Sequence, residues 1–95
     1  MVGPKATVKS VFSAEYEVVL RTLVAARKGA RLTQQELARQ LGKPQSFVSK
    51  YERRERRIDI VELVLIAQAL GLDPAQIVRD LEVHLASHKG ARETN

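Results

Sequence analysis

Gly42 and Pro44 stand two residues apart inside a helical pattern, and this spacing constrains the fold more than any other feature of the sequence. Gly42 tolerates the left-handed conformation that ends a helix, and Pro44 suits the start of the next one. Upstream, Thr33 and Glu36 form a capping box, in which a hydroxyl and a carboxylate each satisfy a backbone N–H at a helix start. The sequence therefore predicts two short helices, one after Thr33 and one over about 44–53, joined by a very short turn.

Three further helices are predicted from apolar residues at helical spacing and from capping residues. Ser13, Asp59 and Asp73 each precede such a pattern and can cap its first turn. Gly29 and Gly71 follow two of the patterns and can take the left-handed conformation that ends a helix. Since no strand-like alternation is present, we expect an all-α chain. The expected organisation is a flexible arm over 1–12, a folded domain over 13–88 and a flexible tail over 89–95.

Length and composition exclude several classes of protein. A chain of 95 residues with 44% apolar residues suits one compact domain and has no room for a second, catalytic one. Cysteine is absent, which excludes disulfides and thiolate metal sites and favours a reducing compartment. The longest strongly apolar run, 63–67, is too short to span a bilayer, and the N-terminus lacks a secretory apolar region. We therefore expect a soluble, cytoplasmic protein.

Positive charge is concentrated in the first part of the chain. The formal net charge is +5, and residues 1–58 hold 13 Lys and Arg against 5 Asp and Glu. The densest segment is 43–57. A polyanion partner would explain this clustering, because each phosphate neutralised by Lys or Arg releases condensed counterions. A solvated charged face explains the charge alone equally well.

Two stretches of the sequence, LTQQELARQLG at 32–42 and SFVSKYE at 46–52, match a known motif. Ala38 is small where the two short helices must meet, Gly42 lies at the turn, and Val48 and Tyr51 return to the core. Here the chain resembles the Xre/Cro-like helix-turn-helix family, which includes the lambda-type phage repressors. The resemblance covers about 20–77 without a gap. It implies a five-helix, lambda-repressor-like domain that binds double-stranded DNA, with the helix-turn-helix over about 33–53.

The resemblance also implies which residues touch DNA: Gln34 would bond a phosphate, and Gln45 would enter the major groove. A glutamine amide can bond adenine N6 and N7, a serine either base type, and a lysine guanine or a phosphate. The predicted base contacts are Gln45, Ser46, Ser49 and Lys50. Cations around this helix suit phosphate contacts that set register, although some serve solubility only. With Gln34, the predicted phosphate contacts are Lys43, Arg53, Arg54, Arg56 and Arg57.

Other residues of the motif have structural interpretations. Phe47 either touches a thymine methyl group or pads the junction of the two short helices, and we favour padding. Residues placed like Arg27 and Glu52 form a largely buried ion pair in the family, so we expect these two to be structural partners. The sequence departs from the family at Arg31 and Arg54, where glycine is frequent. Gly29 could serve the first of these helix ends, but no glycine lies near the second.

No residue set indicates catalysis or a cofactor, because Ser/His/Asp and Cys/His arrangements and phosphate-binding glycine loops are missing. His84 and His88 lie four apart and could share a metal ion, but no third ligand is evident. We therefore take them as surface histidines and expect no metal. The rival to DNA binding is a protein-interaction module, such as the antitoxin of a toxin–antitoxin pair. The sequence does not separate phage repressors, restriction–modification controllers and antitoxins.

Apolar residues of the last two predicted helices could build a homodimer, bind a different protein, or only cover the core. A dimer agrees with DNA binding, because two recognition helices about 34 Å apart match successive major grooves. We therefore expect a symmetric homodimer that regulates transcription from a palindromic operator, by repression rather than activation. The predicted interface residues are Val61, Leu65, Ile77, Leu81 and Leu85.

Overall fold

The computed structural model describes residues 13–93, with side chains over 13–87, so the predicted arm over 1–12 lies outside the described residues. The described part holds five helices and no strand. The all-α prediction is therefore confirmed. The helices are α2 (Ala14–Gly29), α3 (Gln34–Leu41), α4 (Gln45–Glu52), α5 (Ile60–Ala69) and α6 (Pro74–Glu93).

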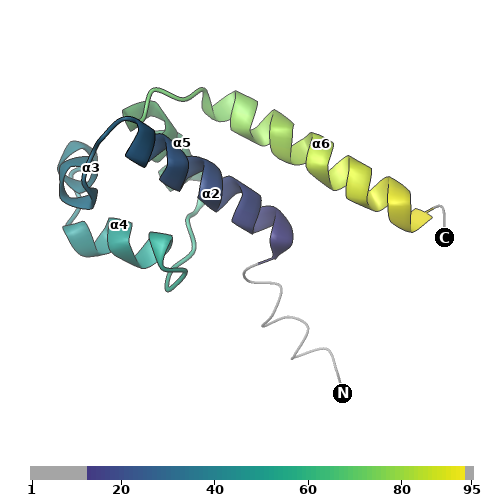
Figure 1. Cartoon of the computed structure of the whole chain (residues 1–95), viewed down its shortest axis with the longest axis horizontal. Coiled ribbons are helices and arrows are strands. Elements are labelled where there is room, and N and C mark those ends of the chain that lie inside the picture. The colour runs from purple at the N-terminus through teal and green to yellow at the C-terminus, as the bar shows by residue number, and fades with distance from the viewer. Residues whose placement is uncertain (1–12, 94–95) are drawn as a thin grey trace, which may run out of the picture.

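The two short helices α3 and α4 lie together at one end of the molecule, and α2 passes beside them (Figure 1). Helix α5 packs against α3, while α6 packs against both α2 and α5. Beyond this contact α6 continues away from the body of the molecule, toward the C-terminus (Figure 1). The short pair is therefore held by the other helices on one side and is left open on the other.

Helix starts follow the predicted caps. The Thr33 hydroxyl accepts from the Glu36 N–H at 3.0 Å, and the Glu36 carboxylate accepts from the Thr33 N–H at 2.8 Å. Asp59 and Glu62 form a second capping box of the same kind at the start of α5. The Ser13 side chain accepts from the first turn of α2. These caps satisfy N–H groups that have no partner within their own helix.

Helix ends follow the prediction at Gly42 and Gly71, whose φ angles are +68° and +74°. The prediction is wrong at Gly29, which remains helical, while Arg31 takes the left-handed conformation with φ +61°. The bonds that close α2 decide this register, since the Arg31 and Leu32 N–H groups donate to carbonyls of its last turn. Arg54, after α4, has φ +65° in the same way. A side chain in this region costs about 1–2 kcal/mol that glycine avoids.

The core joins residues of all five described helices. Its buried members are Leu20, Leu23, Leu37, Ala38, Phe47, Val48, Tyr51, Ile66, Ala67 and Ile77. Ile77, predicted as an interface residue, is only 7% exposed and packs in this core, so it has little surface to offer the predicted interface. The reason is its place in the second turn of α6, where that helix lies against the body. An apolar stripe in the sequence cannot distinguish this turn from the exposed turns beyond it.

Helix α6 continues to Glu93, past the end of the domain expected at residue 88. The expected end rested on the polar sequence that follows His88. Residue types with good helix propensity, such as Lys, Ala, Arg and Glu, extend a helix without an apolar face to bury. The tail expected over 89–95 is therefore helical as far as Glu93.

Candidate DNA-binding surface

The turn between α3 and α4 is held by backbone hydrogen bonds. The Gly42 N–H donates to the Arg39 carbonyl at 3.1 Å, and the Lys43 N–H donates to the Ala38 carbonyl at 2.9 Å. Pro44 is the cap residue in front of α4, and its extended backbone turns the chain into the new helix. The small loop therefore sets α4 rigidly against α3, as the Gly42 and Pro44 spacing predicted.

Helix α4 is buried on one side and polar on the other. Phe47, Val48 and Tyr51 lie in the core. Three of the predicted base contacts, Gln45, Ser46 and Lys50, are exposed, and the fourth, Ser49, is half-buried. Among the described residues, none hydrogen-bonds to the side chains of Gln45 and Lys50. The polar face thus presents an amide, hydroxyls and an ammonium group that are available to a ligand.

Phe47 pads the junction rather than facing solvent, as we favoured. It is 8% exposed, and its ring meets that of Tyr51 edge to face, with centroids 5.5 Å apart. The Arg56 guanidinium and the Lys43 ammonium lie over the Phe47 ring, at 4.8 and 5.4 Å from its centroid. Cations therefore lie over the Phe47 ring at the edge of α4.

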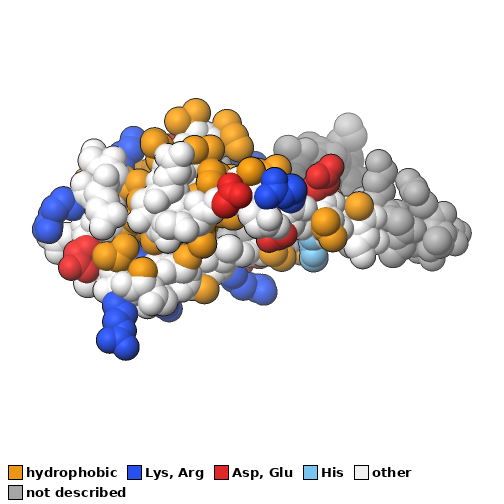
Figure 2. All heavy atoms as spheres, turned by 90° about the horizontal axis from the view of Figure 1, so that it is seen from above, with side chains coloured by type: hydrophobic (Ala, Val, Ile, Leu, Met, Phe, Trp, Pro, Cys, Tyr) orange, Lys and Arg blue, Asp and Glu red, His pale blue; other side chains and the backbone are white. Residues whose placement is uncertain are grey.

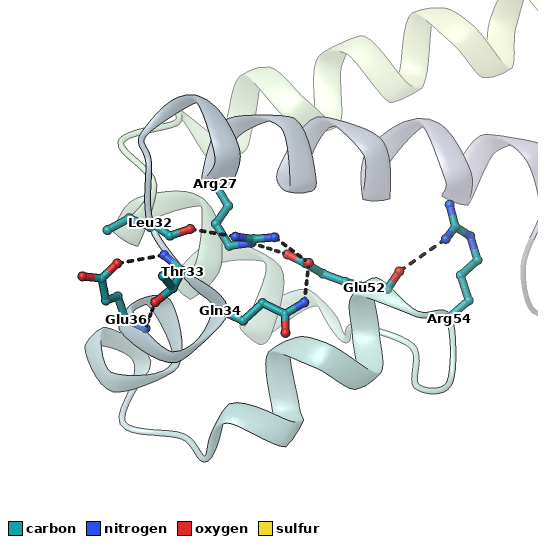
Figure 3. A network of polar contacts seen from close by, with 7 residues as sticks. All are labelled: Arg27, Leu32, Thr33, Gln34, Glu36, Glu52 and Arg54. Carbon is teal, nitrogen blue, oxygen red and sulfur yellow. Dashed lines mark hydrogen bonds and ion pairs between the residues drawn. The ribbon is translucent and has the colours of Figure 1, made fainter.

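The expected ion pair of Arg27 and Glu52 is present and forms the centre of a network (Figure 3). Arg27 Nε and one terminal nitrogen donate to the two Glu52 oxygens at 2.7 and 3.0 Å. Arg27 also donates to the Leu32 carbonyl at 2.7 Å. The hydrogen bond to Glu52 raises the pKa of Arg27 above its ordinary value. The pair joins the end of α2 to the end of α4.

Gln34 is part of the same network. Its amide nitrogen donates to Glu52 Oε1 at 2.9 Å, which places its side chain between α3 and the end of α4 (Figure 3). One N–H of the amide is therefore used inside the protein, and the other remains for a phosphate. Glu52 thus orients a residue that the resemblance assigned to DNA.

Three of the arginines predicted to contact phosphates are paired with carboxylates in this structure. Each guanidinium hydrogen-bonds its partner, at 3.0 Å for Arg53–Glu55, 2.6 Å for Arg54–Glu17 and 2.7 Å for Arg56–Glu62. The hydrogen bond from Arg56 lowers the pKa of Glu62 to about 2. The hydrogen bond from Arg54 lowers the pKa of Glu17, with a smaller contribution from the charge of Arg21.

Sequence reasoning missed these acidic partners. Glu17 lies on α2, far from Arg54 in the sequence, and no local pattern connects the two. Glu62 belongs to a capping box that the sequence contains, but its second bond, to Arg56, needs the fold. Arg57 stacks over the Tyr16 ring at 5.5 Å, so it too is held against α2. The Arg53–Glu55 pair is exposed and stabilises the fold weakly, so a phosphate can replace its carboxylate at small cost, whereas the Glu17 and Glu62 side chains are largely shielded from solvent.

The remaining predicted interface residues differ in exposure. Val61 is 63% exposed, Leu65 46% and Leu85 43%, whereas Leu81 is half-buried. Figure 2, seen from above the view of Figure 1, shows hydrophobic side chains at the surface between polar ones. Leu81 and Leu85 also line an apolar groove of about 360 Å³ that reaches the starts of α2 and α5. The apolar face of α6 is thus incompletely covered within one chain.

Neither a metal-binding cluster nor a membrane-spanning helix is found in the described part of the chain. Over those residues no group of three or more His, Asp or Glu could hold a metal ion. His84 is exposed, and the side chain of His88 lies outside the described residues. The described helices include none that is both long and apolar enough to cross a membrane.

The fold and this surface define a helix-turn-helix domain, and comparisons with known proteins agree. Residues 23–77 match the family described as helix-turn-helix. The structure of an XRE-family like protein from Pseudomonas syringae pv. tomato str. DC3000 is similar, with 42% sequence identity and a TM-score of 0.74. That match covers 82% of this chain and 95% of the other.

A second solved structure, the clp gene regulator ClgR from Corynebacterium glutamicum, shares the fold with 20% identity and a TM-score of 0.63. That match covers 86% of this chain and 87% of the ClgR chain. No curated protein matches the chain. The chain belongs to the Xre-like helix-turn-helix family, a family of DNA-binding transcription regulators.

Proposed function

We propose that this protein is a homodimeric repressor that binds a palindromic operator in double-stranded DNA and reads its bases with α4. The observation that carries the proposal is the polar face of α4, whose Gln45 and Lys50 side chains have no intramolecular hydrogen bond among the described residues. A buried opposite face fixes the helix, so these groups meet DNA without a large ordering cost. Binding at a promoter would block transcription sterically, and would place the protein in the cytoplasm.

The residues divide into those that read bases and those that position the protein. Gln45 can bond adenine bidentately, and Lys50 can reach guanine. Ser46 and Ser49 add hydroxyls to the same face. Phosphate contacts come from Gln34, Lys43 and the arginines 53, 54, 56 and 57, which fix the register without reading sequence. The carboxylate partners of three of these arginines hold them near the surface until phosphates replace the carboxylates.

The second copy of the chain is the partner we assign to the apolar residues of α5 and α6. Leu81 and Leu85 lie one helical turn apart on α6, and Val61 and Leu65 lie one turn apart on α5. The extension of α6 beyond the body gives a second copy room to pack (Figure 1). A two-fold dimer presents two α4 helices, as a palindromic site requires when its half-sites are about 34 Å apart.

The test is a selection of duplexes from a random-sequence library, followed by sequencing of the bound fraction. It is repeated with Gln45→Ala and Lys50→Ala, and with Gln68→Ala on α5 as a matched control for an exposed glutamine. We expect a palindrome whose preference weakens at defined bases in the first two variants, by about 1–3 kcal/mol per base pair. The Gln68 variant should select the same palindrome as the parent protein.

Two results would contradict the proposal. No enriched sequence, with no binding even at low salt, would show that the surface does not serve DNA. A monomer in light scattering at micromolar concentration, both with and without DNA, would reject the homodimer. Capture of a different protein through Val61 and Leu65 in that monomer would instead favour the interaction module, with an antitoxin as its first example.

A further inference from the structure

A basic hollow lies between α2, the start of α3 and the end of α4. It has a volume of about 490 Å³. The residues that line it are Arg21, Val24, Ala25, Lys28, Gln34, Glu52, Arg53 and Arg54. Arg21, Ala25 and Lys28 follow one another at i, i+4 and i+7, so they share one face of α2. The small Ala25 between the two cations leaves the hollow open.

The charge inside the basic hollow is positive. Four of the eight lining residues are cations. The single carboxylate among them, Glu52, is already paired with Arg27, which does not line the hollow. Arg53 and Arg54 have carboxylate partners of their own. Arg21 and Lys28 are exposed, and neither hydrogen-bonds to another described residue. Arg21 and Lys28 thus line the basic hollow as cations without a hydrogen-bonded carboxylate among the described residues, and the charge of Arg21 also acts on Glu17, the partner of Arg54.

Helix α3 begins at the rim of the basic hollow. Its capping box uses the N–H groups of Thr33 and Glu36, but it leaves those of Gln34 and Gln35 without an acceptor among the described residues. Unpaired N–H groups in a first helical turn favour a negatively charged oxygen. Gln34 also lines the hollow, and with one N–H of its side-chain amide held by Glu52, the other is left to donate to a ligand.

We propose that the basic hollow binds a phosphate group of the DNA backbone, with Arg21 and Lys28 as its principal contacts. This makes α2 a third element of the DNA interface, beside α3 and α4. The inference rests on the proposed function. A helix seated in a major groove about 12 Å wide has a phosphate backbone on either side. The basic hollow adjoins the end of α4, where one backbone leaves the groove.

The chemistry of the basic hollow suits a phosphate from either of two sources, DNA or a free phosphate compound. The DNA backbone is the source we assign, because Gln34 and Arg53 belong both to the hollow and to the predicted phosphate contacts. A free phosphate would have to bind where DNA passes. Separate titrations with duplex DNA and with inorganic pyrophosphate distinguish the two sources.

The experiment measures the salt dependence of operator binding for the full chain and for Arg21→Gln, Lys28→Gln and the double variant. Arg79→Gln on α6 is the matched control, since it removes the same charge from an exposed side chain far from α4. Each lost phosphate contact lowers the slope of log K against log salt by about 0.9. If the plots of log K against log salt for parent and variant cross near 1 M salt, the binding constant at 0.1 M salt falls about eightfold per lost contact, equally for all DNA sequences.

The outcomes separate this inference from the proposed function. A double variant that loses about 1.8 in slope but keeps the parent's sequence preference supports the inference. An unchanged slope beside normal operator selection overturns it and leaves the proposed function intact. If the parent protein binds no DNA, both fail. Amide shifts around Lys28 with pyrophosphate but not with duplex DNA would overturn the DNA assignment and identify a free phosphate compound as the ligand.

Discussion

Loss of the Glu52 carboxylate tests whether the buried ion pair holds the helix-turn-helix together. The side chains of Arg27 and Glu52 are only 11% and 8% exposed, and Glu52 accepts three hydrogen bonds, two from Arg27 and one from Gln34. Glu52→Ala leaves the guanidinium buried with one remaining acceptor, the Leu32 carbonyl. Breaking a buried pair in this way costs about 3–5 kcal/mol, because an uncompensated charge stays in the interior.

This cost is a large part of the free energy of unfolding of the whole domain. A domain of this length has a free energy of unfolding of roughly 5–14 kcal/mol. We expect the midpoint of thermal unfolding to fall by at least about 12 °C, from a shift of about 4–8 °C per kcal/mol. Urea unfolding followed by circular dichroism should show a lower midpoint with an unchanged slope.

Two controls make the reasoning specific. Glu55→Ala removes an exposed pair with Arg53, so its effect should stay below about 1 kcal/mol. The double change Arg27→Met with Glu52→Leu replaces both charges by apolar side chains and should recover most of the lost stability. A Glu52→Ala variant whose urea midpoint equals that of Glu55→Ala would refute the argument, since it would show that the pair carries no buried charge.

Three more predictions concern single positions. The Tyr51 hydroxyl is buried and has no hydrogen-bond partner among the described residues, so Tyr51→Phe should raise the free energy of unfolding by about 1 kcal/mol. A lower urea midpoint in this variant would reveal a partner for the hydroxyl. Arg31→Gly should stabilise the fold by about 0.5–1 kcal/mol, because it relieves the positive φ at this position. Gly29→Ala should stabilise it by a similar amount, because Gly29 is helical. A lower thermal midpoint in either variant would place the left-handed residue elsewhere. Because the folded pKa of Glu62 is about 2, below its ordinary 4.5, the stability from its bond with Arg56 is complete above pH 4.5 and is lost as the pH falls toward 2. Glu62→Gln should therefore flatten stability against pH within that window, and parallel curves for variant and parent would contradict the assignment.

The local sequence determined the elements themselves. The capping box at Thr33, the cap residue Asp59 and the left-handed glycine at Gly42 act within one or two helical turns, so they could be identified from spacing alone. The amphipathic pattern of α4 likewise separated Val48 and Tyr51 from the polar face. These interactions need only neighbouring residues, and the fold class followed from them.

Only the tertiary structure decided which groups meet across the molecule. The pairing of Arg54 with Glu17 joins residues 37 positions apart, and the basic hollow needs α2 beside the end of α4. Ile77 and Leu85 share one apolar stripe, yet one is buried and the other exposed, because α6 lies on the body for only part of its length. Long-range contacts depend on how the helices cross, and a period of 3.6 residues records which face is apolar but not what covers it.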